Sequence, residues 1–178
     1  MVRWIAPITS FTADELWQHI PGEKEESVFL TQWYQGLPLL PEGEALGQDY
    51  WQTVMSVKTA VNKVLEAKRS EGSIGATLAA DVVLYCNSDL SELLAKLGDE
   101  LRFALITSSA IVKPLSESTA AAETDVDGLE IAVLQSEYEK CARCWHHRED
   151  VGSHTAHTEL CGRCIDNVEG DGEVRHFA

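Results

Sequence analysis

Two short motifs, Cys141-Ala142-Arg143-Cys144 and Cys161-Gly162-Arg163-Cys164, share the same Cys-x-x-Cys spacing. Each motif places two thiolates on one tight turn, and zinc prefers four such ligands in a tetrahedron. Sixteen residues separate Cys144 from Cys161, a spacing found in four-cysteine zinc sites. We therefore expect one structural zinc ion on Cys141, Cys144, Cys161 and Cys164, with no open position for water or substrate.

Four histidines lie beside or between these motifs, so a mixed site of cysteine and histidine is an alternative: His146, His147, His154 and His157. The four cysteines nevertheless complete a site without them. The fifth cysteine, Cys86, ends the apolar run 82–86 and is expected to be a buried, unreactive thiol. This use of cysteine favours a reducing compartment and a metal over disulfides.

The chain is strongly acidic, with 29 acidic and 14 basic side chains and a formal net charge of -15. General affinity for nucleic acid comes from Lys and Arg on phosphates, so this balance argues against a non-specific polyanion binder. A nucleic-acid role would require a local basic or aromatic patch. We find no signal peptide and no apolar stretch near the roughly 20 residues that cross a bilayer. We expect a cytoplasmic protein with neither a membrane nor DNA as partner.

Helical patterns fill residues 1–72. Pro7 is typical of the end of a helix already under way, so we expect the opening residues to continue an earlier helix. Thr12 and Glu15 predict a capping box for a second helix. The side chains expected to face inward from this helix, or to anchor the segment after it, are Leu16, Trp17, Ile20, Val28, Phe29, Trp33 and Tyr34.

A long helix is predicted from Glu44 to Glu71 by apolar residues at spacings of three and four: Trp51, Val54, Val57, Val61, Val64 and Leu65. Because such a helix is not stable alone, we expect residues 1–72 to form the last part of an antiparallel helical bundle. Its basic side chains are either a solvated face or a ridge that contacts phosphates: Lys58, Lys63, Lys68 and Arg69.

Strand patterns appear after residue 72. Strands are predicted at 81–86, 110–115 and 129–134, with a helix over 89–106 that is interrupted at Gly98. Residues 116–128 are expected to form an exposed loop or a hairpin insertion. The predicted fold class is α+β, in three parts. These are the partial helical bundle (1–72), a small α/β junction unit with a short mixed sheet (73–136), and a four-cysteine zinc finger (137–178).

Several side chains near the cysteines have two interpretations. Arg143 and Arg163 either offset the negative charge of the thiolates or reach a phosphate backbone. Trp145 either covers the metal site or stacks on a nucleobase. Arg175 and Phe177 belong either to a frayed end or to a contact with single-stranded RNA. No phosphate-binding loop, dinucleotide-binding motif or catalytic triad is present, so the sequence indicates no active site.

Three stretches, in this order, share a pattern with one family: Trp4-Ile5-Ala6-Pro7-Ile8 with Phe11-Thr12-Ala13-Asp14-Glu15-Leu16-Trp17; Val61-Asn62-Lys63-Val64-Leu65-Glu66-Ala67 with Ile74-Gly75-Ala76-Thr77-Leu78; and Lys140-Cys141-Ala142-Arg143-Cys144-Trp145-His146 with Cys161-Gly162-Arg163-Cys164. They resemble the carboxy-terminal region of bacterial isoleucyl-tRNA synthetases, over essentially the whole chain. Ala142 departs from the proline common in the family, and 116–128 matches no motif of it.

The resemblance implies the last helices of an anticodon-binding bundle, an α/β junction and a terminal zinc finger. It also implies that the intact protein joins isoleucine to its tRNA with ATP, in a catalytic domain with HIGH and KMSKS motifs. Neither motif occurs in this chain, which on this interpretation is a fragment that binds no ATP itself. The implied partners are isoleucine tRNA, gripped at its anticodon arm, and the rest of the synthetase chain.

By the resemblance, the zinc ligands are Cys141, Cys144, Cys161 and Cys164. The candidates for RNA contact are Arg143, Trp145, Arg163, Arg175 and Phe177, together with Lys58, Lys63 and Arg69 on the long helix. Two alternatives remain. The finger also resembles that of formamidopyrimidine-DNA glycosylases, but Met1-Val2-Arg3 lacks their N-terminal proline and glutamate. The other alternative is a freestanding zinc-finger RNA-binding module without catalytic activity.

Overall fold

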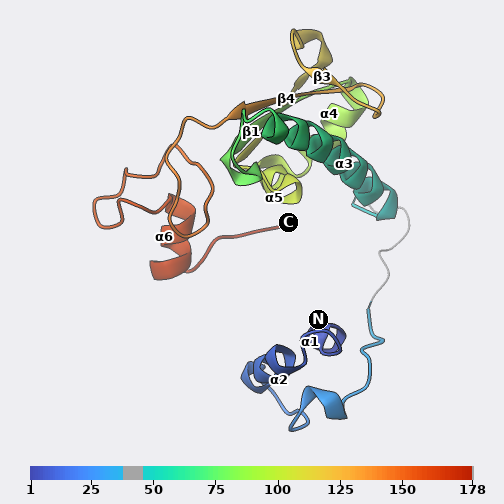
Figure 1. The fold of residues 1–178 in the computed structure, drawn as a ribbon, viewed down its shortest axis with the longest axis vertical. Coiled ribbons are helices and arrows are strands. Elements are labelled where there is room, and N and C mark those ends of the chain that lie inside the picture. The colour runs from blue at the N-terminus through green and yellow to red at the C-terminus, as the bar shows by residue number, and fades with distance from the viewer. Residues whose placement is uncertain (38–45, 178) are drawn as a thin grey trace. The chain divides into compact units, whose positions relative to one another are not determined.

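The computed structural model describes residues 1–37 and 46–177, which belong to two compact units, Met1–Glu42 and Gly43–Ala178 (Figure 1). The predicted helix start at Glu44 and the terminal Ala178 lie outside the described residues. Each unit has its own buried apolar cluster. The cysteines form a third cluster within the second unit.

The first unit is a short helical hairpin of α1 (Val2–Ile5), α2 (Ser10–His19) and the 3-10 turn η1 (Val28–Leu30). Its core consists of Ala6, Ala13, Trp17 and Val28. The Asp14 carboxylate accepts hydrogen bonds from the Ser27 hydroxyl (2.6 Å) and the Val28 amide (3.0 Å). Since Trp17 also donates to the Glu25 carbonyl (2.8 Å), the segment after α2 is held against this helix.

Three expectations for this unit are only partly met. The end of α1 at Ile5, just before Pro7, agrees with the prediction, but the capping box at Thr12 is wrong because α2 begins at Ser10. The Ile5 carbonyl accepts from the Ile8 and Thr9 amides (both 2.9 Å), so the turn leads into α2 before Thr12. Of the predicted inward residues, Trp17 and Val28 are buried, whereas five are exposed: Leu16, Ile20, Phe29, Trp33 and Tyr34.

The second unit is built on a four-stranded mixed sheet with the order β2-β1-β4-β3. Central strand β1 (Ala80–Cys86) pairs parallel to β2 (Ser109–Pro114) and antiparallel to β4 (Leu129–Gln135), with the short β3 (Ala122–Glu123) at the far edge. Alternate residues of β1 are buried, and Leu84 lies opposite both Val112 and Ile131. The predicted α+β class with a mixed sheet is confirmed, and each predicted strand lies within one residue of its observed bounds.

The long helix α3 (Gln48–Ser70) packs on this sheet (Figure 1). Its buried residues, including Val54, Val57, Val61 and Leu65, share one core with the inward residues of β1 and β4. The predicted apolar stripe is therefore correct and packs on the sheet, whereas the expected helical bundle over 1–72 stays a prediction. The compact second unit begins before α3, whereas the predicted division at 72 and 136 stays a prediction.

The connection from β1 to β2 is helical and interrupted, as predicted. It consists of α4 (Ser88–Ala95), the 3-10 turn η3 (Gly98–Glu100) and α5 (Leu101–Leu105). The Asn87 side chain caps α4 by accepting from the Leu90 amide (3.0 Å). Ile106 ends α5 in the left-handed region (φ 61°) and directs the chain into β2. The 116–128 segment holds the turn η4 (Leu115–Glu117) and β3.

Candidate metal centre and nucleic-acid interface

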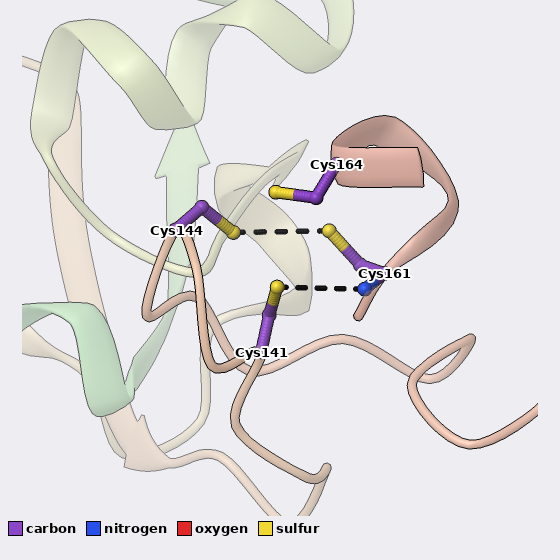
Figure 2. Close-up of side chains that lie close together, drawn as sticks. All are labelled: Cys141, Cys144, Cys161 and Cys164. Atoms are coloured by element: carbon purple, nitrogen blue, oxygen red, sulfur yellow. Dashed lines mark hydrogen bonds between the residues drawn. The ribbon is translucent and has the colours of Figure 1, made fainter. Parts of the chain in front are cut away.

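The four predicted ligand cysteines come together after β4. Their sulfur atoms all lie within 4.8 Å of one another. Figure 2 shows Cys141 and Cys144 on one loop and Cys161 and Cys164 at the start of α6 (Gly162–Glu169), with the four thiols directed towards a common space. Three of them are fully buried and Cys144 is partly exposed.

The geometry of the cluster fits a zinc ion. A tetrahedral site with zinc–sulfur bonds of about 2.3 Å requires sulfur atoms about 3.8 Å apart. The Cys144 and Cys161 sulfurs lie 3.7 Å apart. Burial raises the pKa of the Cys161 thiol to about 12, and a cation among the sulfur atoms would favour its thiolate form.

The backbone of each turn supports its cysteines. In the first turn the Cys141 amide donates to the His146 carbonyl and the Trp145 amide donates to the Cys141 carbonyl, both at 2.9 Å. Trp145 itself lies in the left-handed region (φ 66°), which closes the loop. In the second turn Cys161 precedes α6, and the Gly162 amide donates to the Asp150 carboxylate (2.7 Å).

The two arginines inside the motifs have different surroundings. Arg143 is exposed, and its guanidinium donates to the Cys164 sulfur (3.7 Å). This contact supports the interpretation that Arg143 offsets thiolate charge. Arg163 is half-buried and pairs with Glu173 (2.9 Å) in the C-terminal segment. Arg163 therefore connects α6 to the tail.

The histidines have partners other than the cysteine cluster. His147 contacts the Tyr138 carbonyl (2.6 Å), and His157 contacts Glu169 (2.7 Å). His146 is buried beside Arg102 (3.4 Å), and its burial, together with the charges of Arg102 and three further arginines, lowers its pKa to about 4. Throughout residues 1–37 and 46–177, the four cysteines are the only group arranged to hold a metal ion. The mixed cysteine and histidine site is therefore not supported.

Trp145 does not cover the cysteines. Its side chain is 59% exposed, and the Lys140 ammonium lies 5.1 Å from the ring centroid. The apolar cover of the cluster comes instead from Val151 and Leu160. An exposed indole on a small, fixed turn is free to contact a partner.

The C-terminal segment runs from α6 back to α5 and is not frayed over its described residues (Figure 1). The His176 and Phe177 amides each donate to the Glu100 carboxylate (2.7 Å). The Arg175 guanidinium lies 3.9 Å from the centre of the Phe103 ring. Both predicted contact residues, Arg175 and Phe177, are thereby held beside α5.

The predicted basic residues of α3 lie outside this region. Lys63 contacts Asp125, and Arg69 pairs with Glu66 (3.5 Å). Lys68, from the same helix, pairs with Glu71 (3.0 Å), and Lys58 is half-buried. Since most of these charges have acidic partners within the chain, the interpretation of a phosphate-facing ridge on α3 gains no support.

Sequence reasoning missed the residues that attach the cysteine module to the sheet. The Ser108 hydroxyl accepts from the His147 amide (2.6 Å), and the Ser108 carbonyl accepts from Arg148 (3.5 Å). Phe103 contacts the His146 ring, with the centroids 5.7 Å apart. No motif marks Ser108 or Phe103, because their role depends on contacts between segments about 40 residues apart.

Comparisons with known proteins agree with this architecture. Residues 1–84 match the family "Anticodon-binding domain of tRNA ligase", and residues 139–167 match "Zinc finger found in FPG and IleRS". The zinc-finger family includes both protein classes whose fingers the sequence resembles. The anticodon-binding family does not fit the glycosylases. No helix of residues 1–37 and 46–177 is long and apolar enough to cross a bilayer.

Isoleucine–tRNA ligases match the chain over almost its whole length. The protein of Saccharophagus degradans is 59% identical over 177 residues, which cover 99% of this chain and 19% of the relative. The Pseudomonas putida protein is 58% identical over 179 residues, 100% of this chain and 19% of the relative. The chain thus spans about a fifth of the length of these relatives. The chain is homologous to the isoleucine–tRNA ligases, which are class I aminoacyl-tRNA synthetases, and corresponds to their C-terminal anticodon-binding domain and zinc finger.

Proposed function

We propose that this chain grips the anticodon arm of isoleucine tRNA as part of an isoleucine–tRNA ligase, and that one zinc ion on the four cysteines shapes its binding surface. In this proposal the rest of the synthetase chain joins isoleucine to the tRNA with ATP, in the cytoplasm. The observation that carries the proposal is the exposed Trp145 on the turn that holds Cys141 and Cys144.

The zinc ion would have a structural role. Four thiolate ligands leave no open position, so the ion has no place for a water or substrate. Cys141, Cys144, Cys161 and Cys164 would hold it, while Val151 and Leu160 exclude water from its surroundings. The bound ion would fix the two turns relative to each other, and with them the exposed indole.

The conformation of Trp145 supports a binding role for its ring. A left-handed conformation costs a non-glycine residue about 1–2 kcal/mol. The turn maintains it through the hydrogen bond from the Trp145 amide to the Cys141 carbonyl (2.9 Å). An indole held in this way loses little further freedom on stacking against a base, and such stacking contributes about 1–3 kcal/mol.

The function is tested by measuring the affinity of the zinc-loaded chain for isoleucine tRNA. We expect tighter binding to this tRNA than to a valine tRNA transcript, because the anticodon arms differ. The dependence on salt should correspond to only a few phosphate contacts, because the chain carries a net charge of -15. No detectable binding, or equal binding of both transcripts, would contradict the proposal.

Replacing Trp145 with alanine is expected to weaken binding of isoleucine tRNA by about 10- to 100-fold, the loss of one stacked base. Zinc content should not change, because the side chain is 59% exposed and supplies no metal ligand. Trp145→Phe should retain most of the affinity. Tyr138→Ala, which removes another half-exposed aromatic ring, is the matched control. Loss of zinc from Trp145→Ala would show that the indole covers the metal instead.

A further inference from the structure

A cavity of about 510 Å³ lies within the second unit, between α5, the first cysteine turn and the C-terminal segment. Five of the chain's 14 basic side chains line it: Lys96, Arg102, Arg148, Arg163 and Arg175. This concentration contrasts with the net charge of -15 of the whole chain. Its size is within the range of sites that hold small ligands, about 300–1,000 Å³.

The carboxylates of the cavity wall are already engaged. Asp99 pairs with Arg102 (2.9 Å), while the single carboxylate of Glu173 is shared by Arg163 (2.9 Å) and Arg175 (3.2 Å). The remaining two acids accept hydrogen bonds from backbone amides. Glu100 accepts from the amides of His176 and Phe177, and Asp150 accepts from the amide of Gly162. Three arginines are therefore paired with two carboxylates.

Arg148 has no carboxylate within 4.0 Å in the part of the chain that the structure describes. It is half-buried, and its guanidinium donates a long hydrogen bond to the Ser108 carbonyl (3.5 Å). A partly buried guanidinium without an acidic partner retains the capacity to bind an anion, and guanidinium–phosphate pairs are among the strongest hydrogen bonds of proteins. Arg148 thus points to a negatively charged ligand.

Phe103 arranges the other guanidiniums. The centre of the Phe103 ring lies 4.0 Å from the guanidinium of Arg102, 3.9 Å from that of Arg175 and 5.1 Å from that of Arg163. Stacking on an aromatic ring uses the face of a guanidinium and leaves its N–H edges for hydrogen bonds, the geometry that suits phosphate. Phe103 therefore holds charges that repel one another within a single site.

Two features favour a nucleotide over a bare phosphate. One carboxylate oxygen of Asp150 is buried without a hydrogen-bond partner, so it can accept from a hydroxyl of a ligand. Phe177, at the edge of the cavity, is 42% exposed and offers a ring for a base. The cavity thus combines donors for phosphate, an acceptor for a sugar hydroxyl and an aromatic surface.

We propose that this cavity is a nucleotide subsite, which takes one unstacked nucleotide of the bound RNA. Its phosphate contacts Arg148 and Arg175, and its base stacks on Phe177. The inference rests on the proposed function, because it adds a second RNA contact to that of Trp145. Single-stranded RNA suits such a site, since its unstacked bases can enter pockets that a duplex cannot.

The test is titration of the zinc-loaded chain with AMP, followed through the arginine side-chain N–H resonances by NMR. Adenosine and inorganic phosphate are the comparison probes. We expect AMP to bind at least about tenfold more tightly than either, because it alone makes both kinds of contact. Arg148→Gln and Arg175→Gln should each weaken AMP binding by about tenfold. Lys113→Gln, which makes the same change of charge on β2 and outside the cavity, should leave it unchanged.

Four outcomes would overturn the inference: no binding of AMP, equal binding of AMP and phosphate, equal effects of all three substitutions, or tighter binding of tetraglutamate than of AMP. Measuring the binding of isoleucine tRNA to the same preparation distinguishes failure of the subsite from failure of the proposed function. If the tRNA binds and Arg148→Gln leaves its affinity unchanged, the subsite is wrong while the proposed function stands. If AMP binds and the tRNA does not, both the function and the role of the cavity in RNA binding fail.

Discussion

Replacing Cys161 with serine is expected to abolish zinc binding and to unfold residues 139–177, while the sheet stays folded. Cys161 belongs to the cysteine cluster and contributes nothing to the core between α3 and the sheet. Apparent zinc-binding free energies of small fingers are about 10–16 kcal/mol, which makes metal binding and folding one process in such modules. Zinc content by mass spectrometry and amide hydrogen exchange would measure the two effects.

Cys86→Ala is the matched control for this substitution. Cys86 is buried at the end of β1, outside the cysteine cluster, and its thiol has a pKa raised to about 11 by burial. We expect full zinc content and a modest loss of stability, about 1 kcal/mol. Complete removal of the metal by a chelator should reproduce the Cys161→Ser result. Native-like protection of 139–177 in the metal-free chain would show that zinc is not the structural element.

Replacing Leu65 with alanine is expected to destabilise the second unit by about 2–5 kcal/mol. The side chain is 1% exposed and lies in the core formed by α3, β1 and β4. Removal of this buried volume leaves a cavity that the surrounding side chains fill only in part. Urea unfolding followed by circular dichroism would give the change in the free energy of unfolding.

Met55→Ala, on the same helix, separates packing from helix propensity. Met55 is 54% exposed, so its truncation should change stability by less than about 0.5 kcal/mol. Hydrogen exchange locates the effect: Leu65→Ala should lower the protection of β1 and β4 amides. Unchanged protection in both strands would mean that α3 is stabilised by other helices, as the sequence alone had indicated.

Local features of the sequence were sufficient for several correct predictions. The two Cys-x-x-Cys motifs predicted the cluster of four cysteines, because each pair lies on one turn and needs few distant contacts. The strands followed from runs of β-branched residues, and the break near Gly98 separates α4 from α5 as expected. The apolar stripe of α3 correctly identified the buried face of this helix.

Only the tertiary structure decided what that stripe packs against. A periodic pattern shows which face of a helix is buried but contains no information about the partner, so the sequence did not predict that the sheet covers α3. In the first unit, side chains that were predicted to face inward are exposed. Leu16 and Ile20 have helical spacing and apolar side chains, yet they are 45% and 36% exposed.

The surroundings of the cysteine module likewise depend on the fold. The sequence predicted contact roles for Trp145, Arg163 and Arg175 but left each of them with two interpretations. The structure exposes Trp145 and gathers Arg163 and Arg175 with Arg102 around Phe103. These residues span more than 70 positions of the chain. Sequence spacing predicted the four-cysteine cluster because each Cys-x-x-Cys turn is local, whereas packing between distant segments determined which charges meet around the cavity.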